Sequence, residues 1–258
     1  MIMRNLIQTS VKNNIMTLTI GRPEKKNAIT EAMYLSMTNH INEARQAKDV
    51  KVLVITGADD CFTSGNDLKD FLENPPNGLG SPVFQFMYAL CDFEKPIIGA
   101  VNGPAIGIGV TLLMHCDLVF ATESATFQLP FINLGLVPEF GSSLILPMLI
   151  GHARASEALM LGKPFNSETA LKMGLVNSVF SDSTLMPHTL DTAKVLASKP
   201  PRALQKTKAL INQNKDAVKA QIKIEAEAFA VQLVSAEVKE AINAFFEKRK
   251  PDFTNLEP

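Results

Sequence analysis

The sequence is poor in the residues that build metal centres, disulfide frameworks and charged binding surfaces. Its three cysteines, Cys61, Cys91 and Cys116, lie far apart, and its four histidines show no spacing typical of metal ligands. We therefore interpret the histidines as helix-face or surface residues. The formal net charge is −1, which gives no electrostatic reason for a general nucleic-acid or membrane partner. A reducing compartment and the absence of a metal site are the simplest expectations.

Long apolar runs are missing as well. No stretch reaches the roughly 18 apolar residues that a membrane-spanning helix needs. Met1–Asn5 does not begin a secretory signal, and Asn255–Pro258 does not end in a peroxisomal tripeptide. The expectation from these absences is a cytoplasmic protein without a membrane partner.

Three common cofactor and hydrolase motifs fail on inspection. Gly107-Ile108-Gly109 is followed by Val110, Thr111 and Leu112, so the glycine order of a dinucleotide-binding turn is not met. Gly162-Lys163 lacks both the upstream glycine and the Ser or Thr of a phosphate-binding loop. No G-x-S-x-G nucleophile elbow occurs. We expect no separate cofactor.

Apolar material is abundant. The chain has 258 residues, of which 46% are hydrophobic and 20% charged, enough for one large domain or a core with a small appendage. Alternating or continuous apolar runs predict buried strands, and glycine turns lead from them into helical patterns. This recurrence indicates an α/β fold. The predicted strands are 16–20, 52–55, 97–101 and 118–120, and the predicted helices of this part are 30–48, capped by Thr30, and 108–115.

The C-terminal third has a different character. Ser167 is predicted to cap a helix that stops at Gly174, and residues 216–248 show a helical pattern with a break and new cap at Ser235. This tail has more apolar surface than a lone surface helix needs, so we expect it to pack on another subunit. We predict a core over 1–195 and a helical oligomerisation region over 196–258.

Two glycine-rich segments and one isolated carboxylate stand out. Residues 61–68 and 102–110 can each form a turn that aims backbone N–H groups, and Glu139 follows in apolar surroundings. Two aimed N–H groups can hold a developing oxyanion, and a carboxylate can move a proton. Together they suit carbanion chemistry beside a carbonyl.

In these segments the chain resembles the crotonase superfamily of acyl-CoA enzymes over almost its whole length. Each segment alone is weak, but five in order at the family's spacing form a specific pattern. The five are Gly21–Ala28, Phe62–Leu68, Lys95–Gly103, Cys116–Val119 and Ala244–Arg249.

The resemblance implies a spiral of ββα units with a C-terminal helical trimerisation region, assembled as a trimer or a dimer of trimers. It also implies a coenzyme A thioester as substrate, with the thioester oxygen held by the backbone N–H groups of Asn66 and Ile108. The position of Ile108 usually holds glycine in the family. The substrate-binding residues carried over by the resemblance are Lys25, Lys26, Ala28, Ser64, Gly65, Asn66, Asp67, Leu68, Gly107, Phe131, Phe245 and Lys248.

The departure from the family lies in its acid and base residues. Hydratases of the family use two glutamates, and the matching positions hold Thr111 and Phe131 in this sequence. Glu139, eight residues past the second position, matches the single base of peroxisomal-type Δ3,Δ2-enoyl-CoA isomerases. The resemblance therefore favours an isomerase of fatty-acid β-oxidation with Glu139 as its base. A hydratase or another crotonase-type reaction, and a non-catalytic acyl-CoA-binding protein, stay open as alternatives.

Several of these residues also have plain structural interpretations. Glu139 can be a surface-loop carboxylate, since charged residues are mostly exposed. Asp67 is most simply a helix N-cap, and Asp117 a structural residue at the start of a strand. Lys25 and Lys26 can be solvated turn charges, Lys248 a charge favoured at a helix C-terminus, and Gly65 and Gly107 simple turn formers.

Overall fold

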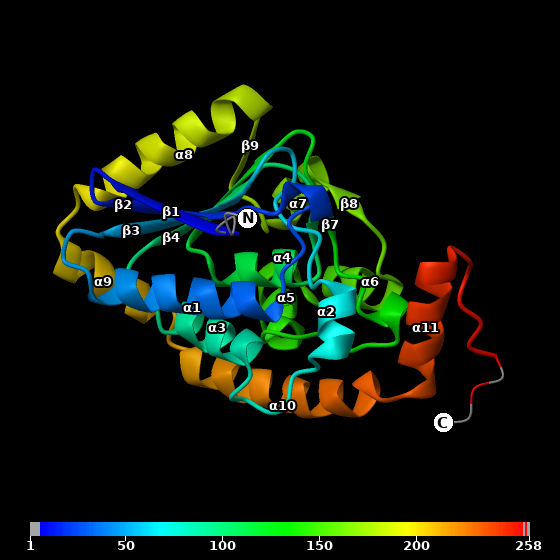
Figure 1. Ribbon diagram of the computed structural model, residues 1–258. Coiled ribbons are helices and arrows are strands. Elements are labelled where there is room, and N and C mark those ends of the chain that lie inside the picture. The colour runs from blue at the N-terminus through cyan, green and yellow to red at the C-terminus, as the bar shows by residue number, and fades with distance from the viewer. Residues whose placement is uncertain (1–5, 255, 257–258) are drawn as a thin grey trace, which may run out of the picture.

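The computed structural model describes residues 6–254 and 256. The terminal residues that the sequence analysis searched for targeting signals, Met1–Asn5, Asn255, Glu257 and Pro258, lie outside the described residues. A six-stranded sheet in the order β1-β2-β3-β4-β6-β9 forms the centre of the described chain (Figure 1). Its first pair is antiparallel and its other pairs are parallel. The strands are β1 (Ile7–Lys12), β2 (Ile15–Ile20), β3 (Val52–Gly57), β4 (Ile97–Val101), β6 (Leu118–Thr122) and β9 (Ser178–Phe180).

The chain passes twice from the large sheet into a smaller, three-stranded sheet. The smaller sheet contains β5 (Ala105–Ile106), β7 (Thr126–Gln128) and β8 (Phe165–Asn166) in the order β5-β7-β8. Strand β5 follows β4, and β7 follows β6, so two of the large-sheet strands are continued by a short strand of the second sheet. This arrangement is the expected crotonase-like α/β fold.

Helices cover both faces of the large sheet, as the apolar runs require. On one face, α1 (Glu31–Gln46) and α3 (Pro82–Cys91) pack together in the main core. On the other face, α8 (Asp182–Ala197) packs on a second apolar cluster that includes Val54, Ile98 and Phe120 (Figure 1). The predicted cap of α1 is confirmed, because the Thr30 side chain accepts a hydrogen bond from the Met33 N–H.

The other described helices are short or lie in the C-terminal half. They comprise η1 (Pro23–Lys25), α2 (Leu68–Glu73), α4 (Ile108–Thr111), η2 (Leu112–His115), η3 (Ile132–Leu134), α5 (Ser142–Ile150), α6 (His152–Leu161), α7 (Ser167–Met173), α9 (Pro201–Ile211), α10 (Lys215–Leu233) and α11 (Ala236–Glu247). None of the described helices is both long and apolar enough to cross a membrane.

One predicted cap was wrong by a residue. The side chain that caps α7 is Asn166, whose oxygen accepts from the Thr169 N–H at 2.9 Å. Ser167 is already the first helical residue, and its hydroxyl donates instead to the Glu123 carbonyl at 3.0 Å. Asn and Ser are comparable N-caps, so the tertiary partner of Ser167 decides between them. The predicted end of this helix at Gly174 is confirmed, with φ at 86°.

The C-terminal helices begin and end as the sequence indicates. Ser235 separates α10 from α11, and its side chain accepts from the Val238 N–H at 3.2 Å. Val218, Ile222 and Phe229 of α10 belong to the main core, while Val231 and Val234 are 72% and 71% exposed. The predicted boundary after residue 195 falls inside α8 and stays a prediction, as does packing on another subunit.

Asn27 joins three loops beneath the first glycine segment. It is fully buried with φ at 55°, and its amide donates to the carbonyl oxygens of Ala58 and Cys61 at 2.9 and 2.6 Å. Its side-chain oxygen accepts from the Arg22 N–H at 2.8 Å, and its own carbonyl accepts from the Thr63 hydroxyl at 2.7 Å. The Asn27 side chain therefore holds the chain at Cys61, at the start of the first glycine segment, while its main chain holds Thr63.

Asn27→Ala removes three side-chain hydrogen bonds and leaves buried backbone groups unpaired. We expect a loss of about 3–5 kcal/mol in the free energy of unfolding. Chemical denaturation monitored by circular dichroism measures it. The matched control is Asn243→Ala on the exposed face of α11, which should stay within about 0.5 kcal/mol of the parent. An Asn27→Ala variant as stable as its control would contradict the structural role.

Candidate active site

The two glycine segments lie against each other. The Thr63 N–H donates to the Pro104 carbonyl, and the Ile106 N–H donates to the Thr63 carbonyl, both at 3.0 Å. Gly65 follows with φ at +89°, and a Cβ atom on it would lie 2.9 Å from the Ile106 carbonyl oxygen. Only glycine fits this backbone conformation and this close approach without a shift of the neighbouring strand.

The hydrogen bonds around these turns leave two N–H groups over. The Ile29 N–H donates to the Gly65 carbonyl, and the Asp67 N–H donates to the Ile29 carbonyl. Asn66 lies between these two bonded residues, so its own N–H points away from Ile29. In the second segment the Gly107 N–H donates to the Gln128 carbonyl, and Ile108 then begins α4. Within residues 6–254 and 256, neither the Asn66 N–H nor the Ile108 N–H has a backbone or side-chain acceptor. They are the two donors that the sequence predicts.

The Asn66 side chain is fixed by a residue that the sequence analysis missed. The Tyr34 hydroxyl of α1 donates to the Asn66 Oδ1 at 2.5 Å, and Tyr34 is itself buried. Burial raises the pKa of Tyr34, and the charges of Glu139 and Asp70 raise it further. Tyr34 therefore lies within electrostatic reach of both the oxyanion-donor segment and the predicted base.

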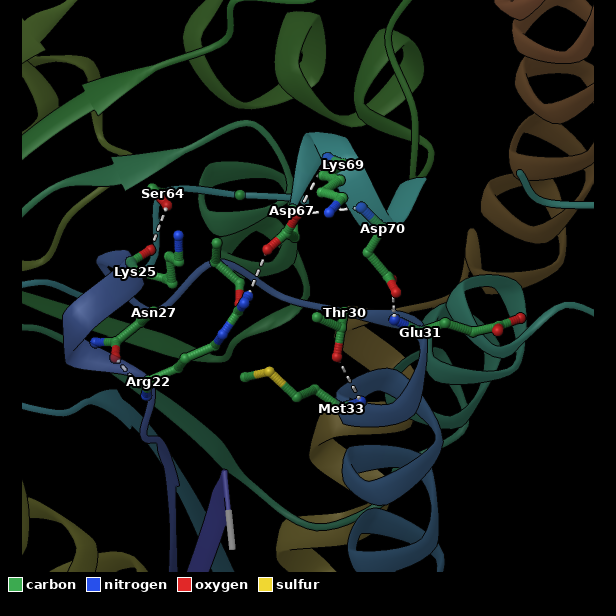
Figure 2. Close-up of polar contacts among 12 residues, drawn as sticks. Arg22, Lys25, Asn27, Thr30, Glu31, Met33, Ser64, Asp67, Lys69 and Asp70 are labelled. Carbon is green, nitrogen blue, oxygen red and sulfur yellow. Dashed lines mark hydrogen bonds and ion pairs between the residues drawn. The ribbon is translucent and has the colours of Figure 1, made fainter. Parts of the chain in front are cut away.

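Asp67 has the capping role that its position suggests. Figure 2 shows its carboxylate at the start of α2, directed toward Arg22 and toward two backbone N–H groups of its own helix. Its Oδ1 accepts from the N–H groups of Lys69 and Asp70, each at 3.1 Å, and its Oδ2 pairs with Arg22. With its oxygens engaged in this way, the carboxylate anchors the segment after Asn66.

The loop with Lys25 and Lys26 runs beside the first glycine segment. The Ser64 N–H donates to the Lys26 carbonyl at 2.9 Å, and the Ser64 hydroxyl donates to the Lys25 carbonyl at 3.4 Å (Figure 2). Both lysine side chains are exposed, and Ala28 is held through its carbonyl by Arg22. The backbone thus brings four predicted binding residues to the same edge of the site.

The positions that hold glutamates in hydratases contain no ionisable group. Thr111 is fully buried, with its hydroxyl directed to the Ile108 carbonyl at 3.5 Å, and Phe131 is 6% exposed just before η3. Among the described residues, no three His, Cys, Asp or Glu side chains are grouped closely enough to hold a metal ion.

Glu139 is a buried carboxylate rather than a surface one. It is 7% exposed, and its Oε1 is enclosed without a hydrogen-bond donor from the described residues. The small pocket it lines is mostly apolar, with Phe71, Phe84, Met87 and Ile222 among its walls. Burial, and then the charge of Glu225, raise the pKa of Glu139 to about 8.

The surroundings of Glu139 and Asn66 meet at α1, α2 and α3. Phe71 and Val83 line both the Glu139 pocket and a neighbouring pocket that contains Tyr34 and Asn66. The Phe86 ring links the two sides, since it contacts Tyr34 at 5.5 Å and Phe140 at 6.0 Å between centroids. The structure therefore brings the predicted base and the predicted oxyanion donors into one region.

Two further residues escaped the sequence analysis. His115, the last residue of the short helix η2, is half-buried: it stacks on the Phe140 ring at 3.9 Å, and its Nε2 donates to the Phe140 carbonyl at 2.8 Å. Glu225 lies on α10, in the same helical face as Val218, Ile222 and Phe229. A carboxylate at a core-facing position of an amphipathic helix is the signal that identifies it.

Phe245 and Lys248 lie apart from this cluster. Both are exposed at the end of α11, where Phe245 contacts the Phe246 ring and Lys248 adopts a left-handed conformation with φ at 56°. No contact joins their side chains to the glycine segments in the described part of the chain. Their reach to the coenzyme A of a neighbouring subunit stays a prediction.

A family described as enoyl-CoA hydratase/isomerase matches residues 10–256. The chain belongs to this family, within the crotonase superfamily. It is 37% identical to "Enoyl-CoA delta isomerase 2" of Rattus norvegicus over 255 residues, which is 96% of this chain and 64% of that protein. The chain therefore spans slightly less than two thirds of that relative's length.

Other members of the family carry different names. The chain is 33% identical to "2,3-dehydroadipyl-CoA hydratase" of Escherichia coli, with 95% of this chain and 96% of that protein covered. A crystal structure of an "enoyl-CoA hydratase/isomerase" from Pseudoalteromonas atlantica superposes with a TM-score of 0.93 at 42% identity, over 97% of this chain and all of that one. Family membership alone does not choose between isomerase and hydratase.

The raised pKa of Glu139 predicts that the free energy of unfolding depends on pH. Below pH 4.5 the carboxyl is protonated in both states, and the stability associated with its raised pKa is fully present. As the pH rises toward 8, the unfolded chain loses this proton and the folded chain keeps it, so that stability is lost. Glu139→Gln lacks this titration, and its stability relative to the parent should increase by on the order of 3 kcal/mol between pH 5 and pH 8.5.

Urea unfolding of both proteins at the two pH values measures this difference. Glu157→Gln, at an exposed carboxylate of α6, is the matched control and should keep a constant difference from the parent. If the stability difference between Glu139→Gln and the parent is the same at both pH values, the fold does not hold the Glu139 carboxyl in its protonated form.

Proposed function

We propose that this protein is an acyl-CoA enzyme, a Δ3,Δ2-enoyl-CoA isomerase of fatty-acid β-oxidation. The observation that carries the proposal is the buried carboxylate of Glu139, with an oxygen that meets no donor in the described residues. Thr111 and Phe131 stand where a hydratase of the family has its two glutamates, and neither can exchange a proton as a carboxylate does. One base is enough for the double-bond shift.

The proposed reaction uses Glu139 twice. In a 3-enoyl-CoA the C2 proton is acidified by the thioester and by the neighbouring double bond. The carboxylate takes this proton, the electrons move into a dienolate, and the thioester oxygen gains negative charge. The N–H groups of Asn66 and Ile108 hold that oxygen, and each well-aimed donor is worth roughly 3–4 kcal/mol in the barrier. Protonated Glu139 then returns the proton at C4, which leaves the conjugated 2-enoyl thioester.

The environment of Glu139 suits this shuttle. A pKa of about 8 makes the carboxylate a stronger base than an exposed glutamate and lets it hold the proton for the return step. The apolar walls formed by Phe71, Phe84 and Met87 exclude water that would otherwise add to the double bond. Burial thus favours isomerisation over hydration.

Water addition is the second candidate, because hydratases are among the relatives and a second carboxylate, Glu225, lines the same pocket. Both oxygens of Glu225 already accept hydrogen bonds, from Gly141 on one side and Ser143 on the other. A carboxylate engaged in this way is poorly placed to activate water, so the isomerase is the stronger proposal.

The parent protein should convert trans-3-hexenoyl-CoA into the conjugated 2-enoyl isomer without a change in mass. Glu139→Gln should lower kcat at least about a thousandfold, because Glu225, the other carboxylate that lines the described pocket, already accepts hydrogen bonds from Gly141 and Ser143. Absorbance of the conjugated thioester and mass spectrometry of the product measure the reaction.

A second substrate, trans-2-hexenoyl-CoA, separates the alternatives. If it gains one water and the 3-enoyl substrate stays unchanged, the protein is a hydratase. If both substrates bind without reacting, and Glu139→Gln binds equally well, the chain is an acyl-CoA-binding protein. Either result overturns the isomerase proposal.

Gly65→Ala tests the oxyanion donors separately from the base. The added methyl would meet the Ile106 carbonyl at 2.9 Å on a residue with φ at +89°, so the Asn66 N–H should be displaced. We expect kcat to fall about a hundred- to a thousandfold. Gly80→Ala, where a Cβ meets no atom within 4 Å, is the control and should keep parental turnover. Equal rates for the two variants would show that the Asn66 donor is not used.

A further inference from the structure

The turn that carries Glu139 has a strained backbone. Phe140 has φ at 61° and Gly141 has φ at 74°, so two consecutive residues are left-handed. This conformation is rare and unfavourable for a bulky residue such as Phe140. The surrounding structure must therefore hold the turn, and the direction of the Glu139 side chain depends on what holds it.

Glu225 holds the turn from one side. Its Oε2 accepts from the Gly141 N–H at 2.5 Å, and its Oε1 accepts from the Ser143 N–H at 2.9 Å and from the Ser143 hydroxyl. Gln221, one turn earlier on α10, donates to the same hydroxyl at 2.9 Å. Three donors from the start of α5 thus converge on one carboxylate that is 5% exposed.

His115 holds the turn from the other side, through its hydrogen bond to the Phe140 carbonyl and its stacking on the Phe140 ring. The peptide group between Phe140 and Gly141 is therefore bound at its carbonyl by His115 and at its N–H by Glu225, two side chains from distant parts of the sequence. Glu225 is the member of this pair that also lines the Glu139 pocket.

We propose that Glu225 is a positioning residue for Glu139. From α10, Glu225 fixes the Phe140–Gly141 turn, and in this way it couples proton transfer by Glu139 to the packing of α10 against the turn. This proposal rests on the proposed function. Glutamate is needed because one of its oxygens accepts from the Gly141 N–H while the other accepts from the Ser143 N–H and hydroxyl. A glutamine has one acceptor and would turn its NH2 group toward an N–H donor.

The titratable groups around Glu139 come from several elements. Glu225 faces it from α10, Tyr34 from α1, and His115 contacts the next residue from η2, while Asp70 of α2 faces Tyr34. Lys219, on the same helix as Glu225, is paired with Asp92 at 2.6 Å. Loss of the Glu225 charge should therefore lower the pKa of Glu139.

Glu225→Gln should lower kcat for the 3-enoyl thioester about ten- to a hundredfold, because misplacement of a base by about 1 Å has an effect of this size. KM should stay within about threefold, since the residue does not touch the oxyanion donors. The acidic limb of the kcat profile should move to lower pH, because a base with a lower pKa is deprotonated at lower pH.

Two matched variants separate position from charge. Ser143→Ala removes the hydroxyl that donates to Glu225 and keeps the Glu225 charge. Its kcat should fall about threefold or more, while the acidic limb of its kcat profile stays at the parental pH. This variant tests the proposal if Glu225→Gln fails to fold. Glu227→Gln, at an exposed carboxylate two residues along α10, should match the parent in both measurements.

A titration of side-chain carboxyl carbons by NMR, in protein labelled at glutamate Cδ, reads Glu139 without any substrate. Its signal is identified by its loss in Glu139→Gln. A lower midpoint in Glu225→Gln supports the proposal even if the parent proves inactive on the 3-enoyl thioester. The proposal is overturned if Glu225→Gln has the parental kcat. It is also overturned if this variant keeps the parental Glu139 midpoint and loses only thermal stability, and Glu225 is then a structural residue.

Discussion

The active region depends on a close backbone contact between the segments around Gly65 and Ile106. Hydrogen bonds between Thr63 and the Pro104–Ile106 strand set the distance, and the missing side chain of Gly65 allows it. This contact turns two chain segments about forty residues apart into one rigid unit. The N–H groups of Asn66 and Ile108 are aimed by that unit and need no contribution from their own side chains.

The second constraint is the burial of Glu139. An ionised carboxylate in an apolar pocket next to a second buried carboxylate, Glu225, is unfavourable, so the pKa of Glu139 is raised to about 8. The position of Glu139 on a left-handed turn adds backbone strain, which His115 and Glu225 offset from opposite sides. A strained backbone at Phe140 beside a raised pKa at Glu139 is a combination typical of functional sites.

Much of the fold could be predicted from local signals. The caps at Thr30, Asp67 and Ser235 were correct because each hydrogen bond closes within one helical turn. The cap of α7 was placed one residue late, because Ser167 and Asn166 are nearly equivalent caps until the distant Glu123 carbonyl takes the serine hydroxyl. The glycine segments and Glu139 were found through motif order and spacing, which survive without knowledge of the packing.

The sequence by itself determined the α/β class and the family resemblance, and through the order of its motifs it predicted Asn66 and Ile108 as oxyanion donors and Glu139 as the base. Only the tertiary structure decided how that base is held. Tyr34, His115 and Glu225 reach Asn66 or the Glu139 turn from α1, η2 and α10, between 25 and 84 residues away. Such partners leave no local pattern, because a side chain's role in a buried network is set by the elements that fold around it.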